Sequence, residues 1–453
     1  MGGATSASKS LATNPDWRFR QMGTGAGALI AARIVAALCG MVQLPIVLAA
    51  LGVEGLGVWL VLMGLLWSLA ILDFGLGAAA QNQVTALIAD GRRSEAAAVL
   101  GRTRRQLLLV AGGVVIVGLP LALAGPWSEW LGITNPALEA ATPAAVAIVL
   151  IAAAVAVPWS LASRTAAALQ QTWIIGLWTM AGSVLGLGAI IVAARLQWTL
   201  AGFVAAGCIL PVAPQVGTWL TLRRRESWLR SAGEVPPAAS DAWRGGIFFF
   251  LPELGATILG AFVPLLVAIF AGPVGAAAFS VLQRLYGFAV QVQMTGLAAT
   301  WPAYANAAAT QDGDFARRTF RATWWITALG FVTPTLLLTP LMPTVVRWWL
   351  GAGAPAIEPS LLWIMAAWHV LQFCGRPIAI LLHGLGRMRG LTAAGWIGIA
   401  VALPLCAILG PRWGAAGVVV ALAAPYLCLS LPMTAWQAHQ ALAEISAGRS
   451  RKP

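Results

Sequence analysis

The sequence has few charged residues for its length. Of 453 residues, 9% are charged and 59% are hydrophobic, with a mean hydropathy of +0.82. A soluble chain of this length needs a charged surface over its hydrophobic cores, and these charges are too few to provide one. The composition therefore excludes a soluble globular protein and indicates an integral membrane protein whose outer solvent is lipid.

Residue types that build catalytic and metal sites are also scarce. The five cysteines lie in predicted helices without C-x-x-C spacing, and the three histidines are dispersed. No G-x-S-x-G motif and no H-x-x-x-E pair occurs, and the longest outer loop, residues 126–143, offers only Glu129 and Glu139 as catalytic candidates. The sequence therefore predicts no enzyme activity, no cofactor and no metal site.

Apolar runs long enough to span a bilayer recur along the whole chain. A spanning helix needs about 20 apolar residues, and a removed signal peptide is not expected because Met1 to Met22 is polar and lacks a small-residue cleavage site. We predict an all-α membrane protein of about 12 transmembrane helices, at 26–50, 55–79, 106–125, 144–163, 173–194, 199–221, 246–270, 275–299, 322–343, 361–383, 391–410 and 414–436.

The basic residues are distributed unevenly between the two sides of this predicted topology. With the N-terminus inside, 22 of the 28 Lys and Arg residues lie in or beside cytoplasmic segments, three lie in outer loops and three lie within helices. An excess of basic residues in the inner loops fixes orientation. The net charge of +13 is therefore a topology signal and not a nucleic-acid footprint, and we expect a bacterial inner-membrane location with both termini cytoplasmic.

A polar linker divides the helices into two similar lobes. We predict a cytoplasmic N-terminal tail (1–25), an N-lobe (26–221), a cytoplasmic linker (222–245), a C-lobe (246–436) and a cytoplasmic C-terminal tail (437–453). A shift of 220 residues places Gly52 on Gly272 and Arg33 on Glu253, IADGRRSEA resembles TQDGDFARR, and WTLAG at 198–202 resembles WGAAG at 413–417. Six helices per lobe predict a pseudo-two-fold axis along the membrane normal and a central cavity.

These strings also resemble a known family. LGVEGLGVWLVLMGLL, LDFGLGAAAQNQVTALIADGRRSEA and VLQRLYGFAVQVQMTGLAATWPAYANAAATQDGDFARR resemble the second helix, the eighth helix and the following loops of Wzx-type polysaccharide flippases. These belong to the multidrug/oligosaccharidyl-lipid/polysaccharide exporter (MOP) superfamily. The resemblance covers most of the chain as diffuse patterns. It implies a transporter that flips an undecaprenyl-pyrophosphate-linked oligosaccharide for cell-surface polysaccharide biosynthesis.

Arginines within the predicted helices are the candidate substrate-binding residues. A charge at the bilayer centre costs at least about 2.5–3.5 kcal/mol, so it faces a cavity or a partner. Arg33, Arg284 and Arg376 lie inside helices 1, 8 and 10, and Arg164, at the cytoplasmic end of helix 4, aligns with Arg376. Guanidinium groups hold phosphate oxygens in pairs and keep their charge. The alternative is structural, with Arg33 neutralised by Glu253.

Two carboxylates complete the candidate set. Glu253 in helix 7 and Asp73 at the inner end of helix 2 are either counter-charges or relays that couple transport to a proton or sodium gradient. For Asp73, within the string LDFGLG, a structural turn role is favoured.

Two other functions remain open, a drug/cation antiporter and a non-catalytic scaffold, while a membrane glycan enzyme is disfavoured. A drug/cation antiporter of the same superfamily would favour acidic groups in the first lobe, where this chain has Arg33. A non-catalytic scaffold of a glycan-assembly complex would leave the arginines unexplained, and a membrane glycan enzyme would need a catalytic loop. Expected partners are the lipid-linked oligosaccharide, membrane lipids and glycan polymerase or glycosyltransferases, with no nucleic acid.

Overall fold

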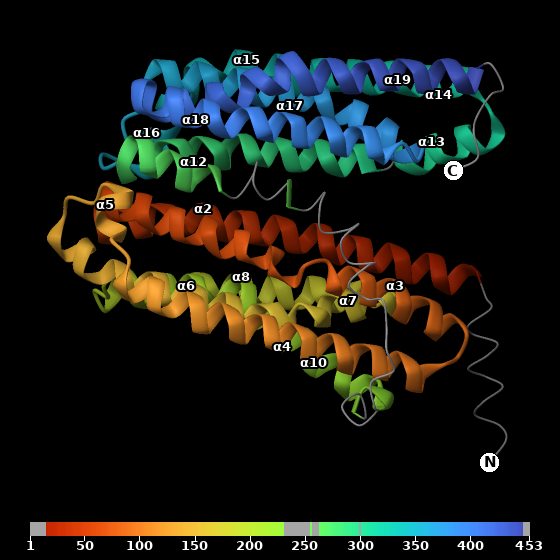
Figure 1. Cartoon of the computed structure of the whole chain (residues 1–453), viewed down its shortest axis with the longest axis horizontal. Coiled ribbons are helices and arrows are strands. Elements are labelled where there is room, and N and C mark those ends of the chain that lie inside the picture. The colour runs from red at the N-terminus through yellow and green to blue at the C-terminus, as the bar shows by residue number, and fades with distance from the viewer. Residues whose placement is uncertain (1–14, 231–253, 256–261, 299, 447–453) are drawn as a thin grey trace. The chain divides into compact units, whose positions relative to one another are not determined.

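The computed structural model describes residues 15–230, 254–255, 262–298 and 300–446, and all regular elements in these ranges are helical (Figure 1). The elements before the linker are α2 (Pro15–Ser68), η1 (Leu69–Asp73), α3 (Leu76–Ala89), α4 (Arg93–Ala124), α5 (Trp127–Leu131), α6 (Pro136–Trp159), α7 (Leu161–Ala168), α8 (Thr172–Arg195), α9 (Leu200–Gly207), α10 (Ile209–Arg225) and η2 (Ser227–Arg230). Those after it are α12 (Val263–Ala298), α13 (Thr300–Thr310), α14 (Gly313–Thr327), the π-helix η3 (Ala328–Val332), α15 (Thr333–Leu338), η4 (Thr339–Leu341), α16 (Met342–Leu350), α17 (Pro359–Gly384), α18 (Met388–Pro425), the π-helix η5 (Tyr426–Ser430) and α19 (Leu431–Ser446).

The described helices confirm the predicted all-α membrane fold. Among the described residues, nine helical stretches are long and apolar enough to cross a bilayer. Three of these stretches contain a glycine with non-helical dihedral angles, namely Gly52, Gly272 and Gly414, and each glycine divides its stretch into two helices. These divisions fit the prediction of about 12 transmembrane helices. The helices extend beyond the apolar runs because polar residues also sustain a helix, so α19 continues past the predicted end of the C-lobe at 436.

Two of these glycines confirm the internal repeat. Gly52 has φ 71° and ψ 179°, and Gly272 has φ 68° and ψ 178°. This region of backbone space is essentially restricted to glycine. The two positions were matched by the 220-residue shift, and they break their helices in the same way at the same place in each half of the chain.

The turns after α3 and α13 follow the same shift, which corrects one detail of the sequence alignment. Arg92 N donates to Leu87 O at 2.8 Å, and Asp312 N donates to Ala307 O at 3.0 Å. Gly91 and Gln311, with φ 76° and 56°, occupy the same left-handed position. Aligning the Asp-Gly pairs of IADGRRSEA and TQDGDFARR is therefore wrong by two residues, because the left-handed position is filled by glycine in one turn and by glutamine in the other.

The proposed equivalence of Arg164 and Arg376 is also wrong. After α7, Gln171 N donates to Ala166 O at 2.8 Å, and after α17, Arg387 N donates to Leu382 O at 2.9 Å. This common turn places Arg164 opposite Ile380. The two arginines were aligned by residue type, but they lie at different distances from the end of their helices, Arg376 about one turn deeper.

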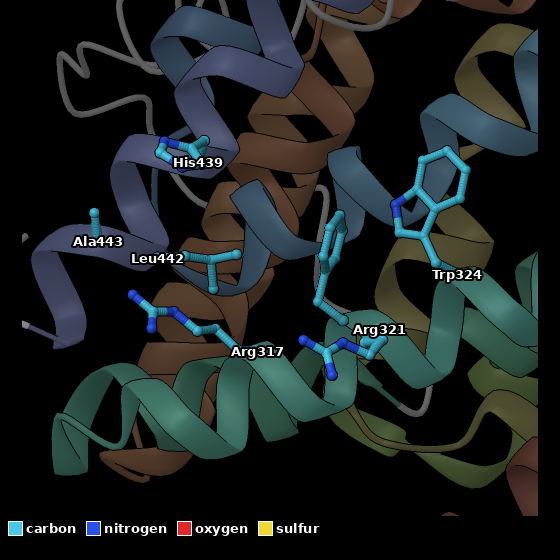
Figure 2. Close-up of a pocket in the computed structure, with 7 residues that line it drawn as sticks. Arg317, Arg321, Trp324, His439, Leu442 and Ala443 are labelled. Atoms are coloured by element: carbon cyan, nitrogen blue, oxygen red, sulfur yellow. The ribbon is translucent and has the colours of Figure 1, made fainter.

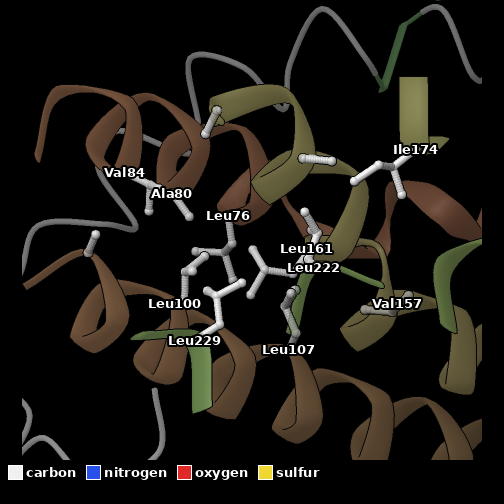
Figure 3. Packing of buried hydrophobic residues seen from close by; sticks show 13 residues of the cluster. Leu76, Ala80, Val84, Leu100, Leu107, Val157, Leu161, Ile174, Leu222 and Leu229 are labelled. Atoms are coloured by element: carbon white, nitrogen blue, oxygen red, sulfur yellow. The ribbon is translucent and has the colours of Figure 1, made fainter. Parts of the chain in front are cut away.

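The described residues form two compact units, each with its own core. The first comprises residues 1–51, 62–127 and 135–254, and the second comprises 52–61, 128–134 and 255–453. In the first unit, Leu76 and Val84 of α3, Leu100 of α4, Leu161 of α7 and Leu222 of α10 are buried together (Figure 3). Leucine and valine at these sites bury apolar area that fixes the helices against one another.

The second unit has a corresponding core. It contains Leu297, Tyr304 of α13, Leu381 of α17 and Ala441 of α19. Tyr304 corresponds to Val84 under the 220-residue shift, and both are fully buried. Segments 52–61 and 128–134 join this unit at its other end, where Glu54 Oε1 accepts a hydrogen bond from Thr134 N at 2.5 Å.

Candidate functional site

A polar face on α17 lies inside the second unit. His369, Gln372 and Arg376 follow one another at spacings of three and four residues, which places them on one side of the helix. Arg376 Nη2 donates to Gln372 Oε1 at 3.0 Å. Arg376 Nη1 is buried and has no hydrogen-bond partner among the described residues. Arg376 Nη1, part of a permanently charged guanidinium, is thus a buried donor without an acceptor among the described residues.

His369 is fully buried and oriented from two sides. Its Nδ1 lies 2.8 Å from Met365 O, so Nδ1 carries the proton and donates to that carbonyl. Its ring stacks on Tyr286 of α12, with centroids 4.5 Å apart and an angle of 21° between the planes. Nε2 has no partner among the described residues. A buried polar atom without a hydrogen bond costs about 1–3 kcal/mol, which marks this position as a place where a polar ligand is favoured.

Hydroxyl and amide groups bond α12 to the neighbouring helices. Tyr286 Oη lies 3.1 Å from Thr339 Oγ1, which itself donates to Thr335 O at 2.6 Å. One helical level away, Gln293 Nε2 donates to Phe373 O at 3.0 Å, while Gln293 Oε1 has no partner in the described part of the chain. These bonds tie α12 to α17 and to the helices after α14, and they keep the polar groups in fixed positions.

A close approach by Tyr426 bounds the other side of Arg376. A Cβ on Gly375 would lie 1.8 Å from Tyr426 Oη, so only glycine admits the tyrosine here. Trp368 packs edge-on against Tyr426 with ring centroids 5.5 Å apart. These residues also border a small cavity of about 100 Å³ that continues along α18 to Ser430. Packing against Tyr426 therefore requires glycine at position 375.

Arg284 lies on α12 two residues before Tyr286 and is partly buried. Acidic residues in the described part of the second unit lie near helix ends, at Glu54, Glu129, Asp312, Asp314, Glu358 and Glu444. Arg376 and Arg284 thus lie within described helices of this unit, away from these carboxylates in sequence.

In the first unit, Asp73 and Arg164 converge on one point. A Cβ on Gly77 would lie 2.9 Å from Asp73 Oδ2 and 3.6 Å from Arg164 Nε. Asp73 Oδ1 also accepts from Gly75 N at 2.8 Å, just before α3 begins. Asp73 therefore has the turn role favoured from the LDFGLG string, and Arg164 has a carboxylate nearby.

Two predicted residues remain, Arg33 and Glu253. Arg33 lies on α2 with an exposed side chain. Glu253 lies outside the described residues, so its pairing with Arg33 remains a prediction.

The chain contains one D-x-D tripeptide, Asp312-Gly313-Asp314, and its first aspartate has a structural role. Asp312 Oδ1 accepts from Phe315 N at 2.9 Å and caps α14. Among the described residues, no group of His, Cys, Asp and Glu is arranged to hold a metal.

His369, Gln372, Tyr286 and Tyr426 were not predicted from the sequence. The signal that was available is the run of polar residues at helical spacing from His369 to Arg376. The three histidines are dispersed along the chain, and His369 joins a polar run only when it is counted together with Gln372 and Arg376.

Comparisons with solved structures agree with this fold. A multidrug resistance MATE family transporter of the MOP superfamily, in an inward-facing conformation, matches with a TM-score of 0.73 and 16% identity over 92% of this chain and 99% of that one. A MOP superfamily transporter from Pyrococcus furiosus, described as having a binding pocket of reverse polarity, matches with a TM-score of 0.65 and 15% identity over 94% and 96%. The lipid II flippase MurJ, in an inward closed conformation, matches with a TM-score of 0.61 and 11% identity over 92% and 89%.

No protein-family model matches the sequence, and the search of curated proteins gave no match. The chain thus has the fold of MOP-superfamily transporters and is a multi-pass membrane protein. The narrower resemblance to Wzx-type flippases remains a prediction.

Proposed function

We propose that the protein is a transporter that flips an anionic lipid-linked oligosaccharide across the bacterial cytoplasmic membrane by alternating access. The observation that carries the proposal is the buried Nη1 of Arg376, which has no hydrogen-bond partner among the described residues. Arg376 lies within the span formed by α17. A guanidinium within a span favours an anionic substrate, because a compensating charge reduces the cost of burying it.

The chemistry of the cluster suits a phosphate-linked glycan. Arg376 offers Nη1, and a planar guanidinium binds phosphate oxygens in pairs. The nearby Gln293 Oε1 and His369 Nε2 are hydrogen-bond acceptors without donors among the described residues, and sugar hydroxyls are donors. A guanidinium that donates to phosphate, beside acceptors for sugar hydroxyls, suits a pyrophosphate-linked oligosaccharide better than a hydrophobic cation.

The same proposal assigns Arg33 and Arg164 to substrate binding in the first unit, with a weaker case for Arg164 because it lies close to Asp73. Glu253 and Asp73 are proposed as counter-charges or as the groups that couple transport to a proton or sodium gradient. Glycan polymerase and glycosyltransferases are the expected protein partners, and both termini are expected in the cytoplasm.

The second candidate is a drug/cation antiporter, which is favoured by the similarity to a multidrug resistance transporter. The two functions differ in the charge of the ligand. The purified protein should be titrated with a fluorescent undecaprenyl-pyrophosphate oligosaccharide and, separately, with the cationic dye ethidium.

We expect the glycan lipid to bind and ethidium not to bind. Arg376→Gln should weaken glycan binding by about tenfold or more, since a hydrogen bond to a charged group contributes about 1.5–3 kcal/mol. Arg318→Gln is the matched control, because Arg318 is exposed on α14. Binding of ethidium without binding of the glycan lipid would instead establish the antiporter.

A further inference from the structure

A basic pocket lies between α14 and α19, away from the polar face of α17. Its volume is about 590 Å³, and it is lined by Arg317, Phe320, Arg321 and Trp324 of α14 and by His439 and Leu442 of α19. Figure 2 shows the α14 residues and the α19 residues on two sides of this space. By the predicted topology, this end of both helices faces the cytoplasm.

The two arginines have no compensating charge on the opposite helix. They are four residues apart on one face of α14, where like charges repel, and neither makes an ion pair with a described residue. Glu444 of α19 is paired with Arg387 instead. Asp314, on the first turn of α14, is exposed and has no ion pair in the described ranges. The pocket therefore holds two cations that an anion would stabilise.

Apart from His439, the rest of the wall is apolar, and it continues into an apolar surface. Phe320 and Trp324 meet edge-on, with ring centroids 6.4 Å apart. Farther along, Trp325 and Ile326 of α14 and Leu329 of η3 are 63%, 65% and 66% exposed. Tryptophan is enriched at membrane–water interfaces. A ligand here would meet cations at the polar end of the helix and hydrocarbon-compatible side chains immediately beside them.

We propose that this pocket binds the phosphate headgroup of an anionic phospholipid of the inner leaflet, with acyl chains along the exposed apolar face of α14. Basic pockets between transmembrane helices on the cytoplasmic side suit anionic headgroups, and two guanidinium groups four residues apart can hold one phosphate from two sides. A free phosphate would use the arginines but not the apolar wall, which is why a lipid is favoured. The proposal concerns a separate surface and does not depend on the transported substrate.

The test is native mass spectrometry of the purified protein titrated with phosphatidylglycerol or with phosphatidylcholine of the same acyl chains. The wild type should bind its first phosphatidylglycerol at least about tenfold more tightly than its first phosphatidylcholine. The double variant Arg317→Gln/Arg321→Gln should lose this preference. Arg318→Gln, which removes an exposed charge that does not line the pocket, should keep it.

A second variant fills the pocket without removing its charge. Ala443→Trp fills the space from an exposed position of α19 while both arginines remain, and it should cause the same loss. A phosphatidylglycerol preference that survives in either variant would overturn the proposal. Glycerol 3-phosphate that competes as strongly as the intact lipid would also overturn it, because the site would then recognise a soluble phosphate.

Discussion

Replacing Arg376 by methionine separates a functional arginine from a structural one, because the two roles predict opposite changes in stability. Methionine has a similar length and no charge. Removing a residue that stabilises the fold lowers the protein's free energy of unfolding. Removing a binding residue that destabilises the fold raises the free energy of unfolding. The two outcomes differ in sign.

The magnitude follows from the contacts of Arg376. A charge within a membrane span costs at least about 2.5–3.5 kcal/mol, and Nη1 has no described partner to offset that cost. The substitution also removes the donor to Gln372 Oε1, and an amide oxygen left without a donor costs about 1–3 kcal/mol. The net expectation is that Arg376→Met raises the free energy of unfolding by about 1–2 kcal/mol, which lowers the unfolded fraction by a factor of about 5–30.

The assay is unfolding of the purified protein in mixed detergent micelles, followed by circular dichroism at increasing sodium dodecyl sulfate. Arg318→Met serves as the control, and its free energy of unfolding should stay within about 0.5 kcal/mol of wild type. Glycan binding should be lost in Arg376→Met and kept in the control. A lower free energy of unfolding for Arg376→Met would refute the reasoning, since it would show that the guanidinium stabilises the fold.

Two further predictions test packing and orientation. Gly57→Ala should lower the free energy of unfolding by about 1–3 kcal/mol, because its Cβ would lie 1.8 Å from the carbonyl oxygen of Pro273. Gly287→Ala is the control, because its Cβ would have no atom within 4 Å, and it should leave the free energy of unfolding unchanged or raise it. Equal effects of the two substitutions would contradict the close approach at Gly57. In a cysteine-free background, a single cysteine at Thr134 should react in intact cells with an impermeant thiol reagent and one at Ser94 should not; the reverse pattern would invert the predicted topology.

The spans and the repeat were predictable because they rest on local properties of the chain. Apolar runs locate the helices, and a glycine at matched positions in both halves located the breaks at Gly52 and Gly272. The alignment of Arg164 with Arg376 failed because residue type was compared without knowing where each helix ends. The structure supplies that reference through the hydrogen bonds of the following turns.

The partners of the arginines were less predictable because they come from other helices. The stacking of Tyr286 on His369 depends on how α12 packs against α17. The convergence of Asp73 and Arg164 on Gly77 likewise joins η1, α3 and α7. Periodicity places a residue on a face of its own helix but does not say which face of another helix it meets.

The paired glycines also bear on how two halves of one chain drift apart after a duplication. Around Gly52 and Gly272 there is open space, since an added Cβ would have no atom within 4 Å. Only the backbone conformation opposes substitution there. Every other encoded amino acid is an L-residue whose Cβ is strained at these φ and ψ angles. A d-alanine introduced by chemical ligation should therefore be accepted where l-alanine is strained. The backbone requirement falls on the glycine and not on its neighbours, so these two positions mark the register of the repeat where the surrounding residues differ.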